Sequence, residues 1–139
     1  MQSPTNVDHL GVVVYSIEEA SRLYRDVLGL PSEGIEELPD QKVRVACFQL
    51  GEARIELIEP TAEDSPIAKF LDRKGPGLHH VAYRVDDLPA TLAALKSAGI
   101  RLIDETPRRG AHGMLIAFAH PKSTGGVLME FCQQGCTPV

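Results

Sequence analysis

The sequence predicts an α+β fold built from two βαβββ modules that form a paired, partly open β-sheet cleft. Two observations predict it. Strand and helix signals occur in the same order twice along the 139 residues. In each copy the first strand contains a histidine and the last strand contains a glutamate. The modules span about 7–59 and 79–133, joined by a connector over 60–78. We therefore expect residues 1–139 to form a single domain with an internal repeat.

The first module begins with an apolar, β-branched run over 7–14 that predicts a strand. A helix follows, because Ser16 and Glu19 have the spacing of a capping box and Gly29 supplies a C-terminal stop. A two-residue hairpin signal, Gly51-Glu52, separates the last two strands of the module. The three strands after the helix are expected at 35–38, 43–50 and 53–59.

The connector is expected to hold one short helix, and the second module repeats the strand and helix signals of the first. One short helix starts at Ser65-Pro66, an N-cap followed by a first-turn proline. A strand over 79–85 then precedes a helix that Asp87 caps and Gly99 ends. The last three strands are expected at 101–104, 114–119 and 127–132.

Composition excludes several classes of protein. The 14 Lys and Arg residues against 19 Asp and Glu give a net charge of −5, without the basic stripe that nucleic-acid binding needs. No apolar run approaches the ~18–20 residues of a membrane span, and the N-terminus lacks a signal-peptide pattern. We expect a reduced, cytoplasmic protein that binds neither nucleic acid nor membrane. Three cysteines without metal-type spacing agree with this: Cys47, Cys132 and Cys136.

The candidate site consists of one histidine and one glutamate from each module. The segment 9–14, which begins with His9, aligns with the segment 80–85, which begins with His80, and Ile55-Glu56-Leu57 aligns with Met129-Glu130-Phe131. Apolar neighbours on both sides of each glutamate turn its side chain to the opposite face of the strand. Each residue alone is more typical of a structural or surface position. Because they recur at matched positions, the set favours a site for Zn, Co, Ni, Mn or Fe(II) with room for substrate oxygens.

Residues 7–133 resemble the methylmalonyl-CoA epimerases, which belong to the vicinal oxygen chelate superfamily together with glyoxalase I. The stretches that carry the resemblance are Asp8-His-Leu-Gly11, Arg54-Ile-Glu-Leu-Ile-Glu-Pro60, Asp64-Ser-Pro-Ile-Ala68, Gly77-Leu-His-His-Val-Ala82, Gly110-Ala-His-Gly113 and His120-Pro-Lys-Ser-Thr-Gly-Gly-Val-Leu-Met-Glu130. The resemblance implies a homodimer that acts on an acyl-CoA substrate. It also implies a divalent metal ion (Co, Zn, Ni or Mn) held by residues matching His9, Glu56, His80 and Glu130.

The implied reaction inverts the α-carbon of methylmalonyl-CoA through a metal-stabilised enolate, so a proton leaves one face and returns on the other. Two carboxylates from opposite modules suit that task, and we expect Glu130 and Glu56 to act as the proton carriers. Some family members carry a glutamate on the strand matching 43–50, which has no carboxylate here. A metal-bound water is therefore an alternative to Glu56.

Two turns late in the chain are candidate substrate-binding segments. Glycines around His112 and Gly113 permit close backbone approach to a substrate carboxylate, whereas a flexible loop before a strand explains the same pattern. Lys122 and Ser123 could meet anionic parts of the ligand, although a polar turn ending in two glycines explains them also.

Three other functions share this architecture. A glyoxalase I-type lactoylglutathione lyase uses similar metal chemistry on a glutathione hemithioacetal. A non-catalytic ligand-binding member would need an apolar, often aromatic groove, which seven Phe and Tyr residues and the absence of Trp disfavour. An extradiol dioxygenase would use two histidines and one carboxylate on Fe(II), which makes Glu56 surplus.

Overall fold

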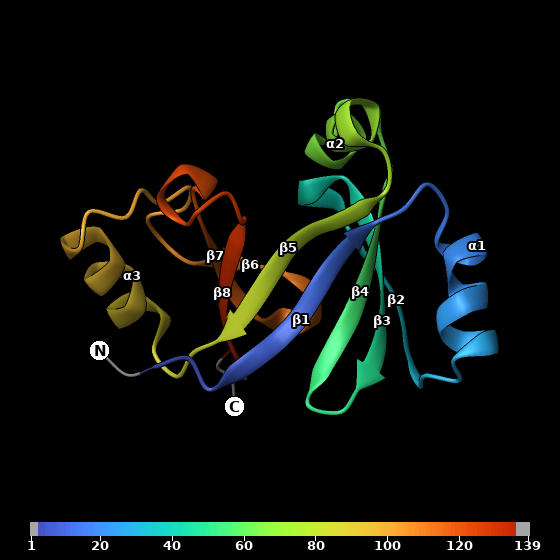
Figure 1. Cartoon of the computed structure of the whole chain (residues 1–139), viewed down its shortest axis with the longest axis horizontal. Coiled ribbons are helices and arrows are strands. Elements are labelled where there is room, and N and C mark those ends of the chain that lie inside the picture. Colours follow the sequence, from blue (N-terminus) through green and yellow to red (C-terminus); the bar gives the residue numbers. More distant parts are fainter. Residues whose placement is uncertain (1–2, 136–139) are drawn as a thin grey trace. The chain divides into compact units, whose positions relative to one another are not determined.

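The computed structural model describes residues 3–135 and confirms the α+β class (Figure 1). The chain divides into two compact units. The N-terminal unit is His9–His79, and the C-terminal unit is Met1–Asp8 together with His80–Val139. Among the described residues, no helix is both long and apolar enough to cross a membrane.

Each unit repeats strand, helix and three strands, as the sequence predicts. The strands are β1 (Asn6–Val13), β2 (Ser32–Leu38), β3 (Val43–Leu50), β4 (Ala53–Pro60), β5 (Gly77–Arg84), β6 (Arg108–Arg109), β7 (Leu115–Ala119) and β8 (Met129–Gln133). The α-helices are α1 (Ile17–Ser21), α2 (Pro66–Lys74) and α3 (Leu88–Ser97). Short 3-10 turns are η2 (Pro39–Gln41), η3 (Ala111–Gly113) and η4 (Pro121–Ser123), and η1 (Arg22–Val27) is a π-helical turn.

The two units have the same strand connectivity. In the N-terminal unit the strand order is β2-β3-β4-β1, with β1 parallel to β4 and the other neighbours antiparallel. In the C-terminal unit the order is β6-β7-β8-β5, with β5 parallel to β8. In each unit the first strand therefore lies beside the last one, which brings the two ends of the module together.

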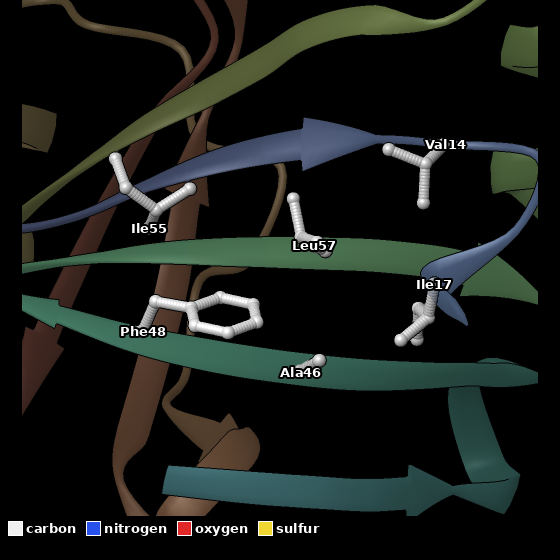
Figure 2. Close-up of a cluster of buried hydrophobic side chains, with 6 residues drawn as sticks. All are labelled: Val14, Ile17, Ala46, Phe48, Ile55 and Leu57. Carbon is white, nitrogen blue, oxygen red and sulfur yellow. The ribbon is translucent and has the colours of Figure 1, made fainter. Parts of the chain in front are cut away.

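A helix covers one face of each four-stranded sheet. In the N-terminal unit, Figure 2 shows the buried side chains on that face, which are Val14, Ile17, Ala46, Phe48, Ile55 and Leu57. In the C-terminal unit the equivalent cluster lies between α3 and the sheet and contains Val85, Leu88, Leu92, Ala117, Ala119 and Phe131. The residues that alternate with these clusters along the strands belong to the opposite face.

The helix starts follow the capping signals. Ser16 accepts a hydrogen bond from the main-chain N–H of Glu19, and Ser65 accepts one from that of Ile67. Asp87 accepts one from the N–H of Ala90. The predicted N-caps are confirmed, because each side-chain oxygen satisfies an N–H that the first turn leaves without a helical partner.

The first helix ends differently from its sequence pattern. It changes after Ser21 into the π-helical turn η1, in which the N–H of Leu28 donates to the carbonyl of Leu23. A π turn adds one residue to each turn of helix, so later side chains rotate away from the buried stripe. Val27, in this turn, is 74% exposed.

The strand predicted at 101–104 is wrong. Only Leu102 forms a bridge, to Ala119, and the next strand is β6, which has two residues. Asp104 explains the interruption, because its Oδ2 accepts the main-chain N–H of Phe118 and so replaces a main-chain acceptor. The chain rejoins β7 where Arg108 pairs with Ile116.

Candidate functional site

A histidine and a glutamate meet on the face of the N-terminal sheet opposite α1. His9 lies on β1 and Glu56 on β4, and Nε2 of the imidazole is 3.6 Å from Oε2 of the carboxylate. Both side chains are buried, with 4% and 7% of the residue exposed. Leu10 and Ile55, their strand neighbours, pack under α1, so the pair occupies the opposite face as predicted.

The C-terminal sheet carries an equivalent pair. His80 lies on β5 and Glu130 on β8, with Nε2 of the imidazole 3.4 Å from Oε1 of the carboxylate. Each residue is 4% exposed. Phe131 packs under α3, which again directs the neighbouring glutamate to the opposite face of the sheet.

The two pairs have the same register. His9 is level with Arg54 on the parallel strand, and Glu56 lies two residues further along. In the C-terminal unit Val81 is paired with Met129, so Glu130 likewise lies two residues beyond the strand partner of His80. The histidine–glutamate pattern is therefore a property of the repeated strand pairing.

The neighbours of the two glutamates differ. Cys47 on β3 is the direct strand partner of Glu56 on β4, and its thiol donates to Oε2 of that carboxylate at 3.8 Å. The equivalent partner of Glu130 on β7 is Phe118, whose ring lies edge-to-face with that of His80 at 5.4 Å between centroids. One carboxylate therefore faces a weak hydrogen-bond donor and the other a hydrocarbon ring.

Burial changes the acid–base behaviour of groups near both pairs. It raises the pKa of the Cys47 thiol and that of Cys132, with the carboxylates of Glu56 and Asp8 acting in the same direction respectively. Both cysteines are therefore protonated, unreactive thiols at neutral pH. Cys136 lies outside the described residues.

His79, which precedes His80, is held in the neutral form. Its ring lies edge-to-face with that of Phe70 at 5.0 Å. Burial, and secondly the positive charge of Lys74, lower the pKa of His79 to about 4. His79 alternates with His80 along β5, so the two side chains belong to opposite faces of the strand.

A buried ion pair supports the C-terminal unit. Asp8 is 2% exposed and accepts hydrogen bonds from Nε and Nη2 of Arg84 at 2.9 and 2.6 Å. A buried carboxylate needs such a partner, because its desolvation is otherwise unfavourable. The pair holds the start of β1 beside the end of β5, where Thr5 donates to the carbonyl of Arg84.

The predicted substrate-binding residues lie in two separate turns. His112 and Gly113 are exposed in η3, with φ values of 58° and 68°, before β7 begins. Lys122 is exposed in η4, after β7 ends, and the hydroxyl of Ser123 accepts the N–H of Arg101 at 2.9 Å. Five extended residues span roughly 16 Å. The two turns are therefore suited to different parts of a long ligand.

The donor sets fit a divalent cation. Each unit offers one imidazole nitrogen and one carboxylate oxygen, which are common ligands of Zn, Co, Ni and Mn. Two ligands at about 2.1 Å and a right angle are about 3 Å apart. The observed separations of 3.6 and 3.4 Å are close to that value.

The sequence pattern does not identify Cys47 and Phe118 as neighbours of the two glutamates. A signal for Cys47 exists, because a two-residue hairpin at Gly51-Glu52 pairs Leu50 with Ala53 and hence Cys47 with Glu56. For Phe118 the sequence offers no comparable signal, since the connection between β7 and β8 is longer and does not define the register.

Comparisons with known proteins agree with the repeated architecture. Residues 8–118 match the model of the Glyoxalase/Bleomycin resistance protein/Dioxygenase superfamily. The mitochondrial methylmalonyl-CoA epimerase of Mus musculus is 41% identical over 128 residues, covering 91% of this chain and 72% of that one. The methylmalonyl-CoA epimerase of Mycobacterium tuberculosis superposes with a TM-score of 0.92 at 40% identity, over 98% of this chain and 94% of that one.

A structure of a methylmalonyl-CoA epimerase in complex with methylmalonyl-CoA and NH4+ is also similar. It superposes with a TM-score of 0.91 at 34% identity and covers 95% of this chain and 96% of that chain.

Proposed function

Because the chain belongs to the Glyoxalase/Bleomycin resistance protein/Dioxygenase superfamily and, within it, to the methylmalonyl-CoA epimerase family, we propose that it inverts the α-carbon of methylmalonyl-CoA. The observation that supports this most directly is the buried histidine–glutamate pair in the same register of both units. An inversion needs groups on both faces of one carbon, and a repeated module supplies two equivalent sets.

In this proposal His9, Glu56, His80 and Glu130 would together hold one divalent cation: Co, Zn, Ni or Mn. When bound, the cation supplies positive charge that stabilises the charge developing on the thioester oxygen as the α-proton leaves. The four residues would leave such a cation able to polarise the substrate as well. The histidines serve this purpose as neutral nitrogen donors.

Glu130 and Glu56 carry the proton in our proposal. One carboxylate removes the α-proton on its face, and the carboxyl group of the other returns a proton on the opposite face. Their unlike neighbours, the thiol of Cys47 and the ring of Phe118, support two unlike tasks. β3 provides no carboxylate for this role, and a water molecule remains the alternative to Glu56.

The remaining assignments concern the substrate and the assembly. We propose that η3, with His112 and Gly113, and η4, with Lys122 and Ser123, contact different parts of the acyl-CoA. We also propose that residues 1–139 act as one domain within a cytoplasmic homodimer. Sedimentation equilibrium tests the dimer, because twice the chain mass of 15.1 kDa is expected.

The experiment that tests the function uses deuterium exchange. Each epimer of methylmalonyl-CoA is incubated separately with the protein in deuterated water, with and without a chelator. We expect deuterium at the α-carbon together with formation of the other epimer, and loss of both after the chelator. A parallel reaction with propionyl-CoA, which lacks the carboxylate, is the control.

Two results would overturn the proposal. One is the absence of α-deuterium and of racemisation from either epimer with Co, Zn, Ni or Mn supplied. The other is turnover of methylglyoxal with glutathione and no reaction of the CoA ester, which would identify a glyoxalase I-type lyase.

A further inference from the structure

Arg108 lies on the same sheet face as the His80–Glu130 pair. In β6 it is level with Ile116 of β7, and Phe118 is two residues further along the same face. Phe118 in turn is level with Glu130 of β8. The strand register therefore places the positive charge of Arg108 at the edge of the C-terminal sheet, on the face that holds the histidine–glutamate pair.

The side-chain contacts follow this register. Cζ of the Arg108 guanidinium lies over the Phe118 ring, 5.5 Å from its centroid. The Phe118 ring lies edge-to-face with the imidazole of His80 at 5.4 Å. A single aromatic ring thus separates the guanidinium from the candidate metal ligand, and that ring removes water from one face of the cation.

Asp104 holds the arrangement in place. Its Oδ1 accepts Nε of Arg108 at 3.1 Å, and its Oδ2 accepts the main-chain N–H of Phe118 at 2.9 Å. Among the described residues, the side chain of Arg108 makes no other hydrogen bond. The bond to Asp104 uses Nε, so both terminal Nη groups keep their donors for a ligand, and the Arg108 side chain is 41% exposed.

We propose that Arg108 recognises the free carboxylate of the acyl group and so selects malonyl-type CoA esters over simple acyl-CoA esters. This inference rests on the proposed function, because it assigns a specificity residue to the same site. A guanidinium is suited to the role, since its parallel N–H groups match the two oxygens of a carboxylate. A group one ring from His80 is also near the acyl end of a ligand bound there.

A role in folding does not account for Arg108. The guanidinium end of its ion pair with Asp104 is accessible to solvent, with 41% of the Arg108 side chain exposed, and ion pairs that reach solvent contribute little to stability. Replacing the arginine is therefore expected to change ligand preference with little change in the melting temperature.

Arg109 provides a matched control. It is level with Leu115 and alternates with Arg108, so it belongs to the opposite face of the sheet. R108Q and R109Q remove the same charge from adjacent positions. The Kd values of malonyl-CoA and propionyl-CoA are measured by calorimetry on metal-loaded wild type and on both variants, together with the deuterium-exchange rate of the wild type.

We expect R108Q to raise the Kd of malonyl-CoA roughly tenfold or more and to change the Kd of propionyl-CoA by less than about twofold. R109Q should leave the ratio of the two Kd values unchanged. Equal weakening of both esters by R108Q would overturn the proposal and assign the arginine to the CoA portion. An unchanged ratio would overturn it also. If the wild type shows no exchange while R108Q loses malonyl-CoA selectively, the proposed function fails and the specificity role stands.

Discussion

Glu56 lies two residues beyond the strand partner of His9, which brings its Oε2 within 3.6 Å of the imidazole Nε2. The same offset relates Glu130 to His80, at 3.4 Å. A parallel pairing of the first and last strands of a module produces both contacts, so the repeat of the fold and the repeat of the site have a single cause.

Replacing His80 tests whether the pairs hold a metal. His80→Ala removes one nitrogen donor, so we expect loss of bound metal and of deuterium exchange. The cavity left by a buried ring should cost about 1–3 kcal/mol in the free energy of unfolding. Metal content after dialysis, measured by mass spectrometry, and far-UV circular dichroism check these outcomes. His120→Ala, at the N-cap of the turn η4, is the control and should retain the metal. Full metal and full rate in His80→Ala would refute the assignment.

Replacing each glutamate tests the division of proton transfer. Glutamine keeps the shape and one potential ligand oxygen but cannot carry the proton. We expect Glu130→Gln to lose exchange from one epimer by about 10²–10⁴-fold, and Glu56→Gln to lose exchange from the other. The measurement is α-deuterium incorporation from each epimer separately. If Glu56→Gln keeps exchange from both epimers, Glu130 is the only glutamate that carries a proton and a water molecule replaces Glu56.

The buried thiols are expected to resist alkylation. Burial raises the pKa of Cys47 and of Cys132, so the reactive thiolate is scarce at pH 8. Iodoacetamide should modify both roughly 100-fold or more slowly in the folded protein than in urea. Peptide mass spectrometry measures the two positions individually. Rapid modification of Cys47 under native conditions would show that β3 opens or that the thiol is ionised.

His79 makes stability depend on pH in a defined window. Its folded pKa of about 4 lies below the unfolded value of about 6.5, so the unfolded chain binds more protons between these values. Stability is therefore full above pH 6.5 and falls as the pH drops toward 4, by up to roughly 3 kcal/mol. Urea unfolding of metal-free wild type and His79→Gln between pH 4 and 8 tests this. The stability of the wild type should fall relative to that of His79→Gln as the pH drops from 6.5 to 4, and a constant difference between the two proteins would contradict the prediction.

Local signals predicted most elements correctly because their causes are local. Ser16, Ser65 and Asp87 start helices through hydrogen bonds within three residues, and Gly51-Glu52 defines the pairing of β3 with β4. The error at 101–104 has a distant cause, since Asp104 takes a hydrogen bond from Phe118, fourteen residues away. Side-chain competition of this kind leaves no periodic trace in the sequence.

The sequence alone predicted which four side chains could act together, because a glutamate between apolar neighbours and a histidine in a first strand recur in both halves. Tertiary structure decided what surrounds them: the thiol of Cys47 at one carboxylate, the ring of Phe118 at the other, and the guanidinium of Arg108 beyond that ring. The physical reason is that alternation along a strand assigns a face to each residue, whereas only the register between strands assigns its neighbours.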